Sequence, residues 1–590
     1  MAESAAALLK RDEQLRGHQA SWLMRWQDIA DFLAPERSRI LTVQPGPIDS
    51  TDLYDSTAIH ASNLLASMIH GTMTPATQPW ISFVMRDEEL NDQQDVKEWL
   101  EDVATRIHKA LRQSNFTTGV HEMYVDLVKF ATGCILAEEK DAPKDGSFGG
   151  FRFTAIPIGT YRISEDKDGL VDTVFRDLKL SRRVCVAMWG AKCGEAFLEK
   201  AKNRPDEIVE VLHAVYPRRD LKYDAKGEAR GGSANLPWAS CYVLKEAKVK
   251  TDEGGFEEFP YAVPRWSKIA GEVHGTGPSH TAIYDVKTLN AFVMFMLQAI
   301  PLAMQPPSLE KDDVVQGDLD RAPGGRIVVS GSGSLADNFM FLDTKYKPEI
   351  AETFRVAMKA EIERMYHANE LQLRDSPQMT ATEVQIRYEL MQRVLGPTTG
   401  RLESEFLNPL TWRCFAIMAR RGAFKALPAA LQTAAGAQSG AADLDVQYEG
   451  PLARAQRTIE LTAQDRTVAF VAGASQAIAP VNPQLAAEVW DVLDIDKMTR
   501  DRAEITGLAS DSLHGEQEVE DTRGARNDAA AQEKKKTDLM GLAEAAGKVL
   551  IPWLDKASKV LTDFFNQMLE GKGIGGQVVD SLKMVGDAIG

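Results

Sequence analysis

The stretch "DVKTLNAFVMFMLQAI", residues 285–300, places apolar side chains at positions i, i+3, i+4, i+7, i+8 and i+11. This spacing puts them on one face of an α-helix. Residues 301–346 lose that period and contain Pro-Pro, "APGGRIVVSGSGS" and the acidic "EKDDVVQGDLD", which predicts an irregular or β-containing insert. Helical spacing returns at Pro348. The sequence therefore predicts two helices separated by a small insert.

The region before this pair contains both helical and strand-like patterns. Apolar residues at helical spacing predict helices near 20–34, 96–111 and 120–130, the first ending before Pro35. The segments 151–163, 170–180, 207–217 and 239–250 are instead rich in β-branched and aromatic residues and are bounded by Gly, Pro and Asp. We therefore expect an α+β unit that ends near residue 276, in a chain that is predominantly helical.

The region after the pair reads as helix with interruptions. The polar "NELQLRDSPQM" (369–379) predicts a loop, and the capping-box match at 380–383 predicts the start of a long helix. Gly396 and Pro397 are expected to kink that helix, because proline lacks a backbone donor. An Ala/Gly/Gln-rich linker follows at 429–442. The last 50 or so residues carry an apolar stripe that requires a partner surface.

Composition limits the possible functions. The 590 residues carry a net charge of -17, which argues against gripping nucleic acid by neutralising its phosphates. An acidic chain can still surround DNA and let it pass. Five dispersed cysteines without a C-x-x-C pair predict buried free thiols. The charged N-terminus does not resemble a signal peptide, and the apolar run 291–304 is shorter than the roughly 20 residues that span a bilayer. We expect folding in a cytoplasm.

Motifs for cofactor chemistry are absent from the sequence. "GLAEAAGKV" (541–549) has five residues between its glycines instead of the four of a P-loop, and Val549 replaces the Mg²⁺-binding hydroxyl. "HGTGPSH" (274–280) lacks the third glycine of a dinucleotide fingerprint. There is no H-E-x-x-H, EF-hand or G-x-S-x-G pattern. We expect no cofactor, no metal and no enzymatic activity.

One stretch favours an alternative. "YDSTAIHASNLLASMIHGTMTPATQPW" (54–80) contains His60, Ser67 and His70, residue types that a Ser/His or metal-dependent hydrolase would use. On a helix, however, the two histidines would lie about 15 Å apart at about 1.5 Å per residue. A nucleophile would also need an orienting carboxylate and an oxyanion hole. The apolar residues of 57–70 form a stripe on the other side, which favours a packing helix over a hydrolase site.

An ordered set of segments resembles the head-to-tail connector proteins of short-tailed bacteriophages, the podovirus portal family. The segments are "WQDIADFLAPERSRI" (26–40), "LYDSTAIHASNLLASMIHGTMTPATQPWISF" (53–83), "LHAVYPRRD" (212–220), "TATEVQIRYELMQRVLGPTTGRLESEFLNPL" (380–410) and "VQYEGPLARAQR" (446–457). They span residues ~20 to ~500 in the family's order, whereas the last ninety residues do not clearly match.

The resemblance implies a portal fold assembled as a dodecameric ring. The implied parts are an N-terminal α+β wing (1–276), a first stem helix (277–300), a clip (301–346), a second stem helix (347–368), a tunnel loop (369–379), a long kinked helix (380–428), further wing or crown (429–500) and a helical crown or C-terminal tail (501–590). Such a ring at one capsid vertex is the channel for packaging and ejecting double-stranded DNA.

The resemblance also implies sites and partners. Gln372, Arg374 and Gln378 in the tunnel loop are candidates for facing DNA, and Lys311, Arg321 and Arg326 in the clip are candidates for docking other proteins. The expected partners are further copies of the chain, major capsid protein and scaffold, the terminase large subunit, and head-tail adaptor or tail proteins. The expected location is the virion vertex, after assembly in the host cytoplasm. No membrane is expected, although the amphipathic tail after residue 537 leaves membrane binding open.

Overall fold

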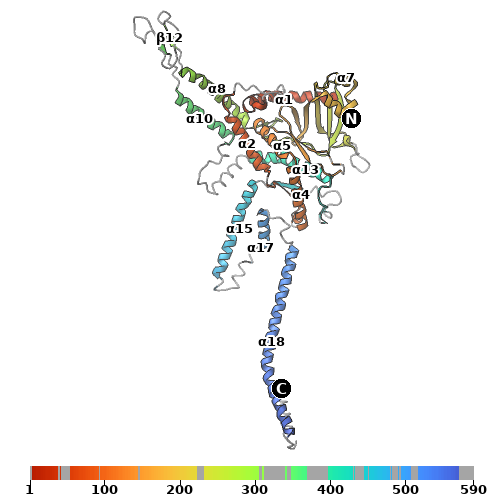
Figure 1. Ribbon diagram of the computed structural model, residues 1–590, viewed down its shortest axis with the longest axis vertical. Helices are drawn as coiled ribbons and strands as arrows, with labels where there is room; N and C mark the ends of the chain where they lie inside the picture. Colours follow the sequence, from red (N-terminus) through yellow and green to blue (C-terminus); the bar gives the residue numbers. More distant parts are fainter. Residues whose placement is uncertain are drawn as a thin grey trace. The chain divides into compact units, whose positions relative to one another are not determined.

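The chain folds into two compact units, Met1–Ile505 and Thr506–Gly590, in the computed structural model (Figure 1). The described residues are 3–37, 40, 53–76, 78–91, 93–141, 143, 146–221, 232–304, 308–310, 339–341, 347–368, 396–429, 431, 444–448, 451–478, 480, 490, 493, 495–506 and 516–569. In the second unit, the described residues after Thr506 form the helix α18 (Glu516–Leu569).

The first unit mixes helices and strands. Its helices are α1 (Ala5–Leu33), α2 (Thr57–Met73), α3 (Glu88–Asn91), α4 (Gln94–Arg112), α5 (Phe116–Phe130), α6 (Arg182–Trp189), α7 (Glu195–Asn203), α8 (Pro278–Met304), α10 (Pro348–Met365), α13 (Asn408–Arg420), α15 (Pro451–Ile478) and α17 (Ile495–Thr506), with short 3₁₀ turns η1 (Pro35–Arg37), η2 (Gly190–Cys193) and η3 (Ser233–Asn235). Its strands are β1 (Ile81–Met85), β2 (Ile135–Glu139), β3 (Phe151–Ala155), β4 (Tyr161–Glu165), β5 (Val171–Ser181), β6 (Ile208–Pro217), β7 (Trp238–Leu244), β8 (Val249–Phe256), β9 (Tyr261–Ala262), β10 (Ser267–Lys268), β11 (Gly275–Thr276), β12 (Ser308–Glu310), β13 (Phe339–Phe341) and β14 (Leu444–Tyr448).

The largest sheet is an antiparallel meander in the order β4-β5-β6-β7-β8. Successive side chains of a strand point to opposite faces. Accordingly, Leu212 and Ala214 of β6 pack in a cluster with Leu8 of α1, whereas Val211 packs with Trp189 and the small helices α6 and α7. The sheet is thus covered by α1 on one face and partly by α6 and α7 on the other. A second sheet has the order β3-β2-β9.

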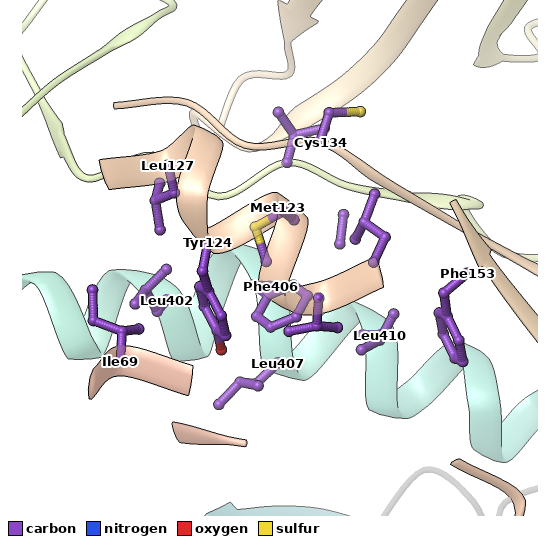
Figure 2. Packing of buried hydrophobic residues seen from close by; sticks show 14 of the residues in the cluster. Ile69, Met123, Tyr124, Leu127, Cys134, Phe153, Leu402, Phe406, Leu407 and Leu410 are labelled. Atoms are coloured by element: carbon purple, nitrogen blue, oxygen red, sulfur yellow. The ribbon is translucent and has the colours of Figure 1, made fainter. Parts of the chain in front are cut away.

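A continuous helix of residues 396–420 crosses the main core, and we call it the 396–420 helix. It contains a π-helical segment, η4 (Glu403–Leu407), directly ahead of α13. Figure 2 shows Leu402 and Phe406 of this helix beside Tyr124 and Met123 of α5, and Leu407 and Leu410 belong to the same buried cluster. The rings of Tyr124 and Phe406 meet edge to face with centroids 5.7 Å apart. This core also contains the beginning of α8.

Most elements predicted from periodicity are confirmed. The helix expected over 285–300 lies within α8, and each of the four segments expected to form strands overlaps at least one strand. The mixed α+β class is confirmed, and all five cysteines are buried and free. The helix expected at 20–34 begins much earlier, at Ala5, because Leu8 packs on the five-stranded sheet, a contact that local spacing does not reveal.

Candidate functional site at the base of a two-helix hairpin

The helices α8 and α10 lie side by side and form a hairpin with the strand pair β12–β13 at its far end. The two helices contact each other directly, and Ser308, Leu309 and Glu310 pair antiparallel with Phe341, Met340 and Phe339. Figure 1 shows the pair leading away from the sheets toward β12. We call α8, β12, β13 and α10 the hairpin. Its helix–strand–strand–helix order agrees with the helix–insert–helix pattern of the sequence.

The hairpin is anchored in the core at one end. The buried residues of α8 all lie between Ser279 and Asn290, and on α10 the buried residue is Ile362, near its end. The Ser279 hydroxyl donates to the Val128 carbonyl of α5 at 3.0 Å and accepts from the buried Tyr366 hydroxyl at 2.9 Å. A single serine thus joins both helices of the hairpin to α5.

Polar contacts from the segment just before α2 fix the flanks of this anchored end. The side-chain oxygen of Asn290 accepts from the backbone N–H of Tyr54 at 2.7 Å, and Lys359 pairs with Asp55 at 2.8 Å. Burial raises the pKa of Asp55, but hydrogen bonds from Lys359 and Thr57 outweigh it and the net pKa is lowered. The start of the 54–80 stretch therefore holds the hairpin in place.

The other end of the hairpin exposes apolar side chains. Residues 288–304 contain no charged residue. Within them Phe295 is 60% exposed and Met304 is 79% exposed. On α10, Ile350 is 64% exposed, and Phe354 contacts Phe292 with ring centroids 4.9 Å apart. A contiguous exposed apolar patch in a folded protein marks an interaction surface.

The apolar run 291–304, which is shorter than a bilayer requires, forms the C-terminal half of α8. The helix α8 is 27 residues long because it continues into the core. By length and composition alone, it is a helix that could cross a membrane within the part of the chain that the structure describes. Core helices of soluble proteins pass the same test, so this observation by itself is weak evidence.

The stretch that favoured a hydrolase forms a packing helix. Ala61, Leu65 and Ile69 of α2 are buried, and His60 and Ser67 are exposed. The Ser67 hydroxyl donates to the Asn63 carbonyl of its own helix at 2.9 Å. His70 lies against Tyr124 and His121, and burial, followed by repulsion from His121, lowers its pKa. Across the described residues, no group of three or more His, Cys, Asp and Glu side chains could hold a metal ion.

The site residues implied by the resemblance are largely outside the described residues. Gln372, Arg374, Gln378, Lys311, Arg321 and Arg326 all fall there. Gly396 and Pro397 begin the described part of the 396–420 helix and are helical. A kink at these two residues stays a prediction, because the residues before Gly396 are not described. Within 396–420 the irregularity is the π-helical segment η4.

A buried charge network, which the sequence analysis missed, lies beside the anchored end. Arg265 is fully buried and forms a bidentate pair with Glu405 of η4, with Nη2 at 2.7 Å and Nε at 3.0 Å from its carboxylate oxygens. The Arg265 backbone N–H donates to the same carboxylate at 2.9 Å. The guanidinium also pairs with Glu165 and donates to the carbonyl of Gly169 at 2.8 Å. One arginine thus joins the five-stranded sheet to the 396–420 helix.

No sequence signal identified this network, because its members lie far apart along the chain. Gly169 has a φ of +79°, a conformation that glycine adopts without strain, so the β4–β5 turn can present its carbonyl to Arg265. Lys268 of β10 pairs with Glu165 at 2.7 Å, and Arg401 pairs with Glu405 at 2.9 Å. The carboxylates are therefore fully supplied with cationic donors, as buried charges require.

A histidine–tryptophan cluster borders the same end of α8. His274 meets Trp26 edge to face with ring centroids 4.8 Å apart, and His280 lies 5.9 Å from Trp22. Both ring nitrogens of His280 and Nδ1 of His274 are buried without a hydrogen-bond partner among the described residues. Burial lowers the pKa of His274 to about 3 and of His280 to about 4, assisted by a nearby arginine in each case. Both histidines are neutral in the folded protein.

These histidines predict a loss of stability in mild acid. Burial also lowers the pKa of His213 in β6 to about 3. Below about pH 6.5 each of these histidines binds a proton in the unfolded chain but not in the folded chain. Each of the three therefore lowers the free energy of unfolding by about 1.4 kcal/mol per pH unit as the pH falls. Burial raises the pKa of Asp126 to about 6 despite its contact with Arg37, which opposes this with the same slope between about pH 6 and 4.

We expect the thermal midpoint to fall between pH 6.5 and 4, and His280→Gln to reduce the steepness of that fall. The measurement is differential scanning fluorimetry across this range. The pH range of this measurement lies above the range in which Asp177 affects stability. The pKa of Asp177 is about 2, because Arg162 and Lys245 overcome the effect of burial. A midpoint that does not change between pH 6.5 and 4 would contradict the prediction.

Comparison with known proteins identifies the family. A family model described as "Bacteriophage head to tail connecting protein" matches residues 5–513. The chain belongs to this family. It is 28% identical over 516 residues to a protein of Bordetella phage BPP-1 named "Probable portal protein", an alignment that covers 85% of this chain and 87% of that one. It is 27% identical over 554 residues to the "Portal protein" of Salmonella phage epsilon15, covering 92% and 94% of the two chains.

Membership assigns a function in connecting the head of a phage to its tail, and confirms the resemblance found in the sequence. This function belongs to a structural component of the virion that interacts with capsid and tail components. The connector family match ends before α18, which begins at Glu516.

Proposed function

We propose that copies of this chain form a dodecameric portal ring at one capsid vertex. The observation that carries this proposal is the hairpin, which is anchored in the core at one end and exposes apolar side chains on the other. Exposed Phe295, Met304 and Ile350 are unfavourable in water, whereas neighbouring hairpins in a ring would bury them. In a closed ring, every subunit buries its hairpin in an identical interface with its neighbours. The names of the two phage relatives support this reading.

In this proposal the hairpin is stem and clip, and the ring is the channel for packaging and ejecting double-stranded DNA. The clip residues Lys311, Arg321 and Arg326 would dock the terminase large subunit and then the adaptor or tail proteins. The rim of the first unit would contact major capsid protein and scaffold, with assembly in the host cytoplasm. The net charge of -17 suits a conduit, because weak attraction to phosphates lets DNA slide.

Mass photometry of the purified full-length chain tests the proposal. We expect a species of about twelve times the subunit mass of 65.0 kDa, visible as rings by negative-stain electron microscopy. A monomer or dimer at all concentrations would overturn it. Flotation with liposomes of neutral and anionic lipid tests the second candidate, a membrane-bound protein, which the length and composition of α8 favour. Flotation of the chain without rings would support that candidate.

The proposed tunnel loop gives a further prediction. Arg374→Ala is expected to leave ring assembly intact and to change DNA packaging or retention, because an arginine facing the channel would contact passing phosphates. Packaged DNA per head, measured by nuclease protection in a phage complementation assay, checks this. Arg183→Ala serves as the control, since it removes an exposed arginine of α6 that is not among the candidates for facing DNA. Unchanged packaging and retention in Arg374→Ala would remove this residue from the channel.

A further inference from the structure

The π-helical segment of the 396–420 helix has a local cause in the sequence. Within η4, the backbone N–H of Asn408 donates to the carbonyl of Glu403, five residues back. Pro409 follows. Proline has no N–H to donate to the carbonyl four residues earlier, here that of Glu405, and its ring crowds that carbonyl. A wider turn relieves the crowding, so Pro409 accounts for the π turn.

The π turn coincides with the residue that binds Arg265. The Glu405 side chain is 5% exposed and lies opposite the fully buried Arg265. On the other side of the same turn, Phe406 and Leu407 are buried in the main core. The extra residue in the π turn allows Glu405 to pair with Arg265 while Phe406 and Leu407 pack in the core. In a regular α-helix the positions before the turn would be rotated by about 100° relative to those after it.

Arg265 connects this turn to the hairpin. It lies two residues before β10, and its guanidinium donates to the Val273 carbonyl at 3.1 Å, two residues before β11. The strand β11 ends at Thr276 and α8 begins at Pro278. A planar, bidentate arginine–carboxylate pair fixes orientation as well as distance. The 396–420 helix is thus tied to the chain that leads directly into the hairpin.

We propose that Pro409 and Glu405 are positioning residues that fix the 396–420 helix to the base of the hairpin through Arg265. Displacement of the hairpin is passed to this helix at that point. The inference rests on the proposed function, because it assigns a consequence for DNA in the ring. A buried ion pair is seldom the most stable way to fill its space, and defining the relative position of two elements is a role that apolar packing would serve less specifically.

Glu405→Gln tests the anchor, with Asp12→Asn as the matched control. Asp12 is also a buried carboxylate paired with a buried arginine, Arg162, at 2.6 Å, but it joins α1 to the five-stranded sheet. We expect both variants to lower the thermal midpoint and both to form rings. Glu405→Gln alone should raise hydrogen-exchange rates at 396–402 and 273–283 together and reduce stable DNA-filled heads at least tenfold.

Equal exchange in these two segments and equal head filling for both variants would overturn the inference. If the wild-type chain forms no ring, the proposed function fails, but the exchange experiment still reports on the anchor, because it needs only the folded chain.

Pro409→Ala tests the positioning role separately. Replacing a proline inside a helix ordinarily stabilises a protein. Here it should lower the thermal midpoint, because an unbroken α-helix turns Glu405 away from Arg265. In the Glu405→Gln background the same substitution should raise the midpoint. An increase of the midpoint in the wild-type background would overturn the role of Pro409.

Discussion

Phe295→Glu is expected to leave the chain folded and to abolish ring formation. Phe295 lies on the exposed end of the hairpin and is 60% exposed in the single chain, so the substitution costs little in the isolated subunit. In a ring, the new carboxylate would be buried between apolar side chains without a partner, which costs several kcal/mol at each interface. Since the cost recurs at every subunit contact, mass photometry should show the 65.0 kDa monomer.

Ile208→Glu is the matched control. Ile208 opens β6 and is 63% exposed, so it introduces the same charge at a similarly exposed apolar residue that is not on the hairpin. We expect it to form rings as the wild-type chain does. Rings formed by Phe295→Glu at wild-type concentrations would exclude the exposed end of the hairpin as a subunit interface.

The second large effect is expected in the core. Phe406→Ala should lower the free energy of unfolding by about 3–5 kcal/mol. Phe406 is fully buried, and its ring contacts Tyr124 of α5, as Figure 2 shows. Its removal leaves a cavity between the 396–420 helix and α5, which a packed core fills only partly. Urea denaturation of the unassembled chain measures the change.

Phe470→Ala provides the comparison, because Phe470 lies on α15 and is 77% exposed. Its effect on the unassembled chain should stay within about 0.5 kcal/mol. Equal losses for the two variants would mean that the 396–420 helix does not stabilise the core of the first unit.

Local patterns in the sequence were sufficient for most elements. The period of 285–300 predicted α8 because a helix with one apolar side repeats every 3.6 residues. The same argument made 57–70 a packing helix, and the exposed positions of His60 and Ser67 in α2 agree with it. The order of segments along the chain also sufficed to recognise the family, since the match to the connector model extends over residues 5–513.

Long-range contacts could not be read from those patterns. Leu8 lies on the five-stranded sheet, so α1 begins well before the apolar spacing that predicted it. Leu289 and Leu297 of α8 belong to the same helical pattern, yet Leu289 is buried and Leu297 is 52% exposed. Periodicity identifies the apolar side of a helix but not what covers it. The division of α8 into an anchored and an exposed end was therefore decided by tertiary structure.

The sequence by itself determined the element types, the two-helix pattern around 301–346, and membership of the connector family. The tertiary structure decided which residues meet at the base of the hairpin. Arg265 is 100 positions from Glu165 and 140 positions from Glu405 along the chain, and each of the three alone reads as a surface charge. Their meeting depends on the β4–β5 turn and on the π turn before Pro409, because side-chain charges interact strongly only when the fold brings them within a few ångströms and removes water.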